Sequence, residues 1–219
     1  MMNSGWTVAV VTPAPVEPVD LATVKQQARI DIATDDNFIE TVIIKTARDR
    51  AQQYLRRCLI DTVVDFTFDG FPWYRIDQAF HLPWGPVKSI ISVSYRDSND
   101  NVTTLAANLY RLESKNEPAR LVPSYSNLWP NTSGGIGAVT VRALVGYPHI
   151  AGNTHPAGSP VPTPAEYRAN IPPSIIHAIL MDCAHLYNNR EAVGEVMGGS
   201  MVTTPLGWES LLDQYRIMV

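Results

Sequence analysis

Two segments at opposite ends of the chain carry apolar residues at helical spacing. The first is predicted to run from about Thr34 to Cys58, with acidic residues in its first half and arginines near its end, which complements the helix dipole. The second is predicted from about Pro173 to Arg190 and is apolar over more than half of its circumference, which indicates a nearly encircled position. Neither helix can bury its apolar face alone, so we expect the two to pack on each other. The predicted contact joins Val42, Ile43 and Ala47 to Ile176, Ile179, Leu180 and Cys183.

Between these helices the apolar residues repeat with a period of two, which is typical of strands. Thr62–Phe68 alternates and is rich in β-branched and aromatic residues. Six more short strands are predicted between turn-forming residues. They are Ala79–Leu82, Val87–Arg96, Val102–Leu105, Tyr110–Leu112, Arg120–Val122 and Ala138–Val145. Short strands separated by turns predict a small antiparallel sheet or barrel.

The remaining segments are predicted from their prolines, glycines and capping residues. Residues 1–18 are proline-rich, which favours an extended arm, and Asp20 is predicted to cap a short helix over Leu21–Ala28. Gly146–Pro173 is a long proline-rich loop, and loops of this length are usually functional or disordered. Gly194–Thr204 is predicted to be flexible.

These elements predict an α+β protein, a helical bundle built from N- and C-terminal helices with an inserted small antiparallel β lobe. The bundle is discontinuous and comprises residues 1–60 and 170–219, including the N-terminal extended arm and a C-terminal docking segment. Residues 61–147 are predicted to form the β lobe, and residues 148–169 the long Pro-rich loop.

Composition narrows the possible roles. Charged residues make up 17% of the chain, which is below the ordinary value of about 25% and suggests that much of the surface meets other protein. The net charge of −4 argues against a non-specific grip on nucleic acid, which needs basic patches. The N-terminus lacks the pattern of a signal peptide, and no apolar run reaches the roughly 20 residues of a membrane span, so a cytoplasmic location is expected.

The sequence carries no recognisable catalytic motif. It contains no Gly-x-Ser-x-Gly elbow, no phosphate loop and no His-Glu-x-x-His. His177 and His185 are eight residues apart and Cys183 is out of line with both, which is the wrong spacing for a shared zinc ion. Cys58 and Cys183 are expected to be small buried residues and not a disulfide. We therefore expect no enzyme activity, no metal and no cofactor.

Several stretches, taken in order and spacing, resemble one protein family. The most specific is Ile171-Pro172-Pro173 leading into a helix that ends in Tyr-Asn-Asn-Arg-Glu. The others are Pro18–Ala22 with Lys25, Tyr54–Ile60, Leu82–Ile90 leading to Val93–Tyr95, Glu117–Leu121, Val139–Tyr147 and Leu206–Arg216. Together they resemble the tailed-phage head–tail connector, or adaptor, proteins found in phages, prophages and gene transfer agents.

The resemblance implies a structural virion protein, made in the bacterial host cytoplasm and located at the head–tail interface. It implies a ring of about twelve copies beneath the portal protein, built by head-to-tail contacts. Such a ring extends the DNA channel and gives a platform for the next neck or tail component. Double-stranded DNA passes through without specific binding, which suits the acidic balance of the chain. No membrane, cofactor or catalysis is implied.

Three other roles are also compatible with the sequence. The chain could be a neck or tail-completion ring protein elsewhere in the connector, a non-virion cytoplasmic binding module, or an enzyme with an unmarked site. An image of the assembled particle would separate these readings.

Two groups of residues are candidate functional positions. The C-terminal end concentrates large apolar side chains, although chain ends normally fray unless something holds them. We expect this segment to dock on the portal or a neighbouring subunit; the alternative is that it folds back on its own bundle. Its residues are Trp208, Leu211, Leu212, Tyr215, Ile217 and Met218. The second group is predicted to be a structural cluster that fixes a helix end against the bundle, and it comprises Tyr187, Asn188, Asn189, Arg190 and Glu191.

Overall fold

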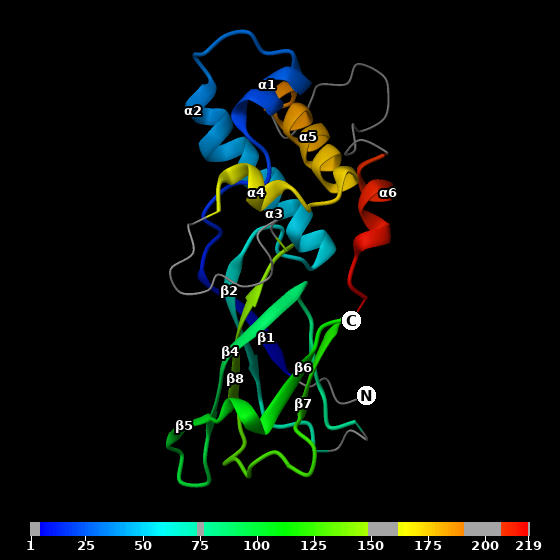
Figure 1. The fold of residues 1–219 in the computed structure, drawn as a ribbon. Coiled ribbons are helices and arrows are strands. Elements are labelled where there is room, and N and C mark those ends of the chain that lie inside the picture. Colours follow the sequence, from blue (N-terminus) through cyan, green and yellow to red (C-terminus); the bar gives the residue numbers. More distant parts are fainter. Residues whose placement is uncertain (1–4, 74–76, 149–161, 191–206, 219) are drawn as a thin grey trace, which may run out of the picture. The chain divides into compact units, whose positions relative to one another are not determined.

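The computed structural model describes residues 5–73, 77–148, 162–190 and 207–218. It contains helices and antiparallel sheets, so the predicted α+β class is confirmed (Figure 1). The chain divides into two compact units. Unit 1 comprises residues 1–15, 60–148 and 217–219 and holds the strands, and unit 2 comprises residues 16–59 and 149–216 and holds most of the helices.

The main sheet of unit 1 has five antiparallel strands in the order β1-β2-β8-β4-β5. Two of the three inner strands, β2 and β8, alternate between buried and half-buried residues, so one face of the sheet covers the core. The strands are β1 (Trp6–Thr12), β2 (Thr62–Phe68), β8 (Val139–Val145), β4 (Val87–Arg96) and β5 (Val102–Leu105).

A second sheet of three strands, in the order β3-β7-β6, contributes to the same unit. Its strands are β3 (Phe80–Leu82), β7 (Ala119–Pro123) and β6 (Tyr110–Glu113), and a short 3-10 helix, η2 (Ala107–Leu109), precedes β6. Aromatic rings connect the two sheets. Phe68 on β2 lies 4.5 Å from Phe80 on β3, and Phe71 stacks on Trp129 at 5.1 Å, measured between ring centroids. Aromatic pairs at these distances stabilise a core beyond the area they bury.

The N-terminal arm differs from the prediction. It was expected to be an extended part of the helical bundle, but Trp6–Thr12 pairs with β2 as an antiparallel edge strand. The pairing is regular from Trp6 opposite Phe68 to Val10 opposite Val64, and it shifts between Val10 and Thr12. The β-forming residues of this segment pair with a strand that is distant in sequence, and Pro13 ends the strand because proline cannot continue the ladder.

Unit 2 begins with α1 (Leu21–Ala28), the predicted short helix. Asp20 caps it, as expected, by accepting a hydrogen bond from the Thr23 backbone N–H at 2.8 Å. The first long helix follows as three consecutive pieces: α2 (Asp36–Phe38), the π-helical η1 (Ile39–Ile43) and α3 (Ile44–Leu55).

One predicted contact of the first long helix, that of Val42, is wrong because of the π-helical turn. Val42 was expected to face the other long helix, but its side chain is 45% exposed, whereas Ile43 and Ala47 are buried. A π turn spreads its residues over a wider turn than an α-helix, and this shifts the face that each residue occupies. The buried positions of the three pieces are Ile39, Ile43, Ile44, Ala47, Ala51 and Leu55.

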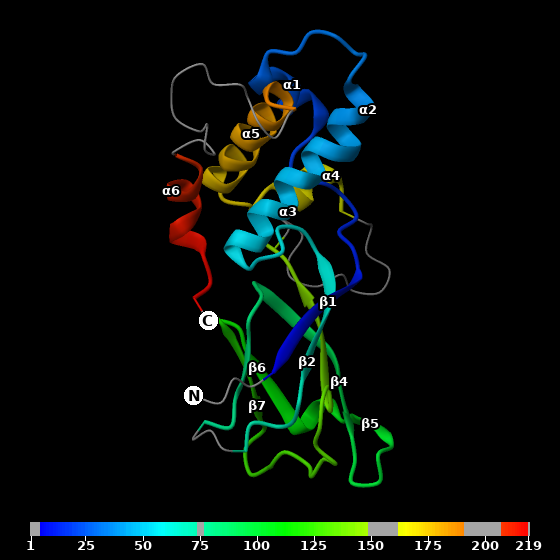
Figure 2. The same ribbon diagram turned by 180° about the vertical axis from the view of Figure 1, so that it is seen from behind.

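The second long helix, α5 (Pro173–Asn188), packs against α1, α3 and α6 (Trp208–Leu212). Figures 1 and 2 show α3, α5 and α6 side by side from both directions. Ile175, Ile179 and Cys183 on α5 are fully buried, and Leu180 is 8% exposed. The chain of unit 2 continues after α6 in the 3-10 helix η3 (Asp213–Tyr215).

Part of the predicted long loop is helical. α4 (Pro164–Arg168) begins at Thr163, whose hydroxyl accepts a hydrogen bond from the Glu166 backbone N–H, while the Glu166 carboxylate accepts one from the Thr163 backbone N–H. This capping box was present in the sequence as Thr-Pro-Ala-Glu, and it explains why the helix starts there. The rest of the predicted loop at 149–161 and the predicted flexible stretch Gly194–Thr204 lie outside the described residues.

Candidate functional site

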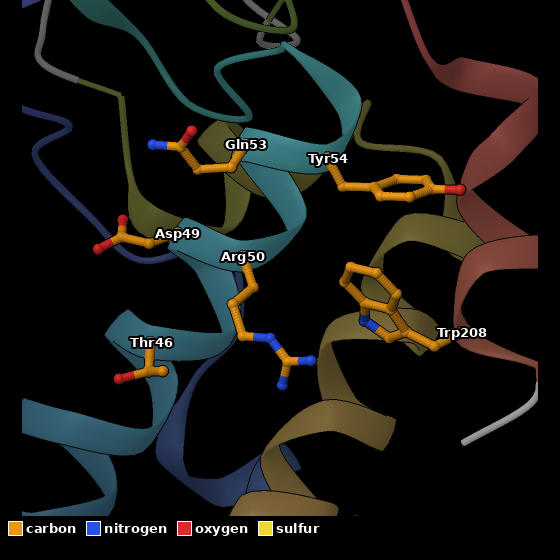
Figure 3. Close-up of a pocket in the computed structure, with 6 residues that line it drawn as sticks. All are labelled: Thr46, Asp49, Arg50, Gln53, Tyr54 and Trp208. Atoms are coloured by element: carbon orange, nitrogen blue, oxygen red, sulfur yellow. The ribbon is translucent and has the colours of Figure 1, made fainter. Parts of the chain in front are cut away.

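The C-terminal segment of unit 2 folds against its own helices. Trp208 is 5% exposed and Leu212 is fully buried, and α6 packs on α3 and α5. The Trp208 ring meets the Tyr54 ring of α3 edge to face, with centroids 5.2 Å apart (Figure 3). This is the arrangement expected if the segment folds back, so these two side chains belong to the core of unit 2.

The other residues of the predicted docking segment have different surroundings. Leu211 and Tyr215 are half-buried in unit 2. Ile217 and Met218 belong to unit 1, where Ile217 is buried close to Gly85, and Met218 is 74% exposed. Docking on a portal or a neighbouring subunit stays a prediction, and the residues with surface to offer are Leu211, Tyr215 and Met218.

Polar contacts also fasten the segment to α3. The Tyr54 hydroxyl donates to the Asp213 carboxylate, and the Arg57 Nε–H donates to the Tyr215 carbonyl oxygen. The Arg216 guanidinium lies 4.9 Å from the centroid of the Tyr54 ring. The hydrogen bond to Asp213, followed by desolvation, raises the pKa of Tyr54 because both favour its protonated form. The segment is therefore anchored by charge and hydrogen bonds as well as by burial.

A groove lies between α3 and α6. Its cavity volume is about 540 Å³, and its lining residues are Thr46, Asp49, Arg50, Gln53, Tyr54 and Trp208 (Figure 3). The Arg50 guanidinium lies 5.5 Å from the centroid of the Trp208 ring, a cation–π distance. The lining residues thus combine one carboxylate, one guanidinium and two aromatic rings.

An ion pair lies beside this groove. Arg50 donates from Nη1 to Oδ1 of Asp182 on α5 at 2.5 Å, and the Asp182 side chain is fully buried. Desolvation raises the pKa of Asp182, and the charge of Arg50 opposes this effect. The second carboxylate oxygen, Oδ2, is buried without a hydrogen-bond partner among the described residues. Arg50 therefore offsets much of the free-energy cost of burying the Asp182 carboxylate.

The end of α5 is fixed by a second polar network. The Tyr187 hydroxyl and the Arg190 Nη2 both donate to Oδ2 of Asp35, at 2.9 Å and 2.5 Å. The Arg190 guanidinium also lies 5.2 Å from the centroid of the Phe38 ring. The hydrogen bond from Arg190, followed by that from Tyr187, lowers the pKa of Asp35 because both favour the carboxylate.

The remaining residues of this predicted cluster are less involved. The Asn189 side-chain amide donates to the His185 carbonyl oxygen at 2.9 Å and satisfies one of the last carbonyls of the helix. Asn188 is exposed, and Glu191 lies outside the described residues. No local pattern indicates that Asp35 is the acceptor of this network, since it lies 155 positions from Arg190.

Metal-ligating side chains do not cluster in the described parts of the chain, and the two cysteines are buried. His, Cys, Asp and Glu side chains there form no group of three that could hold a metal ion. Cys58 and Cys183 are both buried and not joined in a disulfide, and burial raises the pKa of Cys183 to about 12. A thiol with such a pKa is protonated at neutral pH and unreactive. Within the described residues, no helix is both long and apolar enough to cross a membrane.

No protein-family model and no curated protein sequence matches the chain. Three solved structures of gene transfer agent (GTA) particles contain a similar chain. In the neck of an empty GTA particle, computed with C6 symmetry, the TM-score is 0.70 at 17% identity. In the virion of a native GTA particle the TM-score is 0.72 at 17% identity, and in the neck of a native GTA particle, computed with C12 symmetry, it is 0.61 at 16% identity.

Each likeness covers 97% of this chain and 96% of the other. The predicted resemblance is confirmed to the extent that the chains with this fold come from gene transfer agent particles. The chain shares its fold, over nearly its whole length, with chains of gene transfer agent necks and virions.

Proposed function

We propose that this chain is a structural protein of the neck of a phage-like particle. The observation that carries the proposal is the shared fold, which spans 97% of this chain and 96% of chains from GTA necks and virions. In this role the protein is a head-to-tail adaptor. It forms a ring beneath the portal, extends the DNA channel and gives a platform for the next neck or tail component, without catalysis.

The charge and composition of the chain support this role. With 17 basic and 21 acidic residues, each copy is acidic, and a ring of copies repels DNA phosphates and lets DNA pass. A charged fraction of only 17% suits a subunit that is largely surrounded by other protein. Both features favour a conduit over a nucleic-acid-binding protein, whose affinity depends on basic side chains.

The C-terminal segment is the proposed point of docking. Trp208 and Leu212 hold it to α3 and α5, and the polar contacts of Tyr54 and Arg57 fix its direction. Exposed surface of Leu211 and Tyr215 on unit 2 then contacts the portal or a neighbouring subunit, and Met218 on unit 1 offers a separate exposed side chain for docking. Because Trp208 and Leu212 are buried in the subunit itself, the segment stays folded before assembly.

The test is the imaging of particles made with and without the gene for this chain. Without it, we expect DNA-filled heads that lack tails; with the gene restored, we expect a ring of density between portal and tail into which the chain fits. Complete, tailed particles made in its absence would contradict the proposal. A ring found elsewhere in the neck would favour the neck or tail-completion alternative.

A further inference from the structure

We infer that the open edge of β1 is completed by β5 of a second copy of this chain, so that the five-stranded sheet continues from one subunit into the next. The inference rests on the proposed ring. β1 is an end strand of that sheet, and among the described residues no strand pairs with its other side (Figure 2). Its outward backbone N–H and C=O groups therefore form a template for a further strand.

The side chains of β1 are unusually uncovered. Six of its seven residues are exposed and only Val8 is half-buried, whereas β2 beside it alternates regularly between buried and half-buried positions. Val10 is 61% exposed and Val11 is 43% exposed. Both faces of a largely apolar strand are thus open, and within one chain the strand gains little from burial. A partner that covers it adds the missing stabilisation.

β1 also lacks the usual protection of an edge strand. Edges that must stay single commonly carry lysines or other charges, but none of residues 1–16 is charged. The irregular pairing and the prolines are confined to the end of the strand, after Val10, so Trp6–Val10 offers five regular residues. A charged partner would find no complementary charge here, which favours an equally uncharged strand.

The second open edge of the same sheet is such a strand. β5 consists of Val-Thr-Thr-Leu, has no charged residue, and begins at Val102, which is 68% exposed. All four neighbouring pairs in the sheet are antiparallel, so β1 and β5 run in the same direction. β5 of one copy would therefore join β1 of the next as a parallel pair about four residues long.

This pairing has the symmetry that a ring needs. Contact between two different edges is head-to-tail, and such contacts close into rings when the rotation between subunits allows it. Pairing of β1 with β1 of a second copy would use the same surface twice and stop at a dimer. The β1–β5 contact is consequently the one that uses both edges of the sheet in a ring whose subunits are all related by one rotation.

Hydrogen exchange of the backbone amides tests the contact in the full-length protein. The isolated subunit and the ring in purified particles are compared. We expect the outward amides of β1, and whichever of the Thr103 and Thr104 amides in β5 points away from β4, to exchange at least about tenfold more slowly in the ring. Protection of β1 without β5, or of neither, would overturn the inference.

Paired substitutions give a second test. Adjacent residues of a strand direct their N–H groups to opposite sides. One of the two variants Val8→Pro and Ala9→Pro therefore removes a hydrogen bond to β2, and the other removes an N–H group at the open edge. We expect the open-edge variant to keep the melting temperature of the subunit and to lose incorporation into rings. If both variants fail to fold, Val10→Lys takes their place. Its matched control is Ile136→Lys, at an apolar residue of unit 1 that is 99% exposed and outside the sheet edges.

The outcomes separate this inference from the proposed function. Absence of this chain from any ring of the particle overturns both. A ring that contains Val10→Lys as efficiently as Ile136→Lys, with unchanged exchange of β1 amides, overturns only the strand pairing. Selective loss of Val10→Lys from the ring, with protection of both β1 and β5 in the wild type, supports it.

Discussion

Arg50 on α3 donates a hydrogen bond at 2.5 Å to the fully buried carboxylate of Asp182 on α5, which lies 132 positions further along the chain. The pair joins the two long helices of unit 2. Burial disfavours the negative charge of Asp182, whereas the positive charge of Arg50 stabilises it. The stability of unit 2 should therefore depend on this arginine in a manner that pH can reveal.

Replacing Arg50 with methionine keeps most of the apolar stem but leaves the Asp182 charge uncompensated. We expect a loss of about 3 kcal/mol at pH 7, at the low end for a buried pair because the Arg50 side chain is 36% exposed to solvent. The folded-state pKa of Asp182 is raised above the unfolded value of about 3.9. Ionisation of Asp182 therefore lowers the free energy of unfolding as pH rises above that value, and this loss disappears as pH falls and the carboxylate is protonated. Urea unfolding at several pH values measures this.

The matched control is Arg111→Met, at an exposed arginine of unit 1, which should change the free energy of unfolding by no more than about 0.5 kcal/mol. A loss in Arg50→Met that is the same at pH 4 and pH 7 would show that the charge of Asp182 is not the cause.

The second prediction concerns the packing of α3 against α5. Ile179 is fully buried, so Ile179→Ala should lower the free energy of unfolding by about 2–5 kcal/mol through lost burial and a residual cavity. Val42→Ala, in η1 of the other long helix and at a residue that is 45% exposed, should cost less than about 1 kcal/mol. Equal effects of the two substitutions in thermal or urea unfolding would contradict the packing described here.

Asp35→Asn should loosen the end of α5. Its pKa is lowered in the folded protein, so its contribution is fully present above the unfolded pKa of about 3.9 and is lost as pH falls through the lowered folded value. We expect the variant to melt below the wild type at pH 7, with the difference shrinking in acid. The amides near Tyr187 should exchange faster in the variant. A difference in melting temperature that does not change with pH would rule out this electrostatic explanation.

The C-terminal segment gives a fourth prediction. Trp208→Ala should cost about 3–5 kcal/mol, because the side chain is 5% exposed and packs on Tyr54 and Arg50. Met218→Ala, at a residue that is 74% exposed, should leave the melting temperature of the subunit unchanged. If Met218→Ala also reduces incorporation into particles, docking of the segment is supported. Removal of all residues after Thr204 without any loss of stability would contradict the burial of Trp208.

Much of the secondary structure follows from local patterns. The strand over Thr62–Phe68, the strand over Val102–Leu105 and the helix beginning at Pro173 occur where the sequence predicts them. In each case the signal is a period of two or 3.6 bounded by turn or capping residues, which acts over only a few neighbouring positions. The capping box at Thr163 was a local signal of the same kind, hidden within a proline-rich segment.

The sequence by itself thus determined the α+β class, the central strands and the extent of the long apolar helix, because each depends on interactions between near neighbours. Only the tertiary structure decided that Trp6–Thr12 is a strand, since its partner β2 begins some 50 residues later. It also decided which face Val42 occupies, through a π turn, and that Trp208 is buried. The pairing of Arg190 with Asp35 spans 155 positions, and no local pattern can select one distant partner among many. Packing of the whole unit makes that choice.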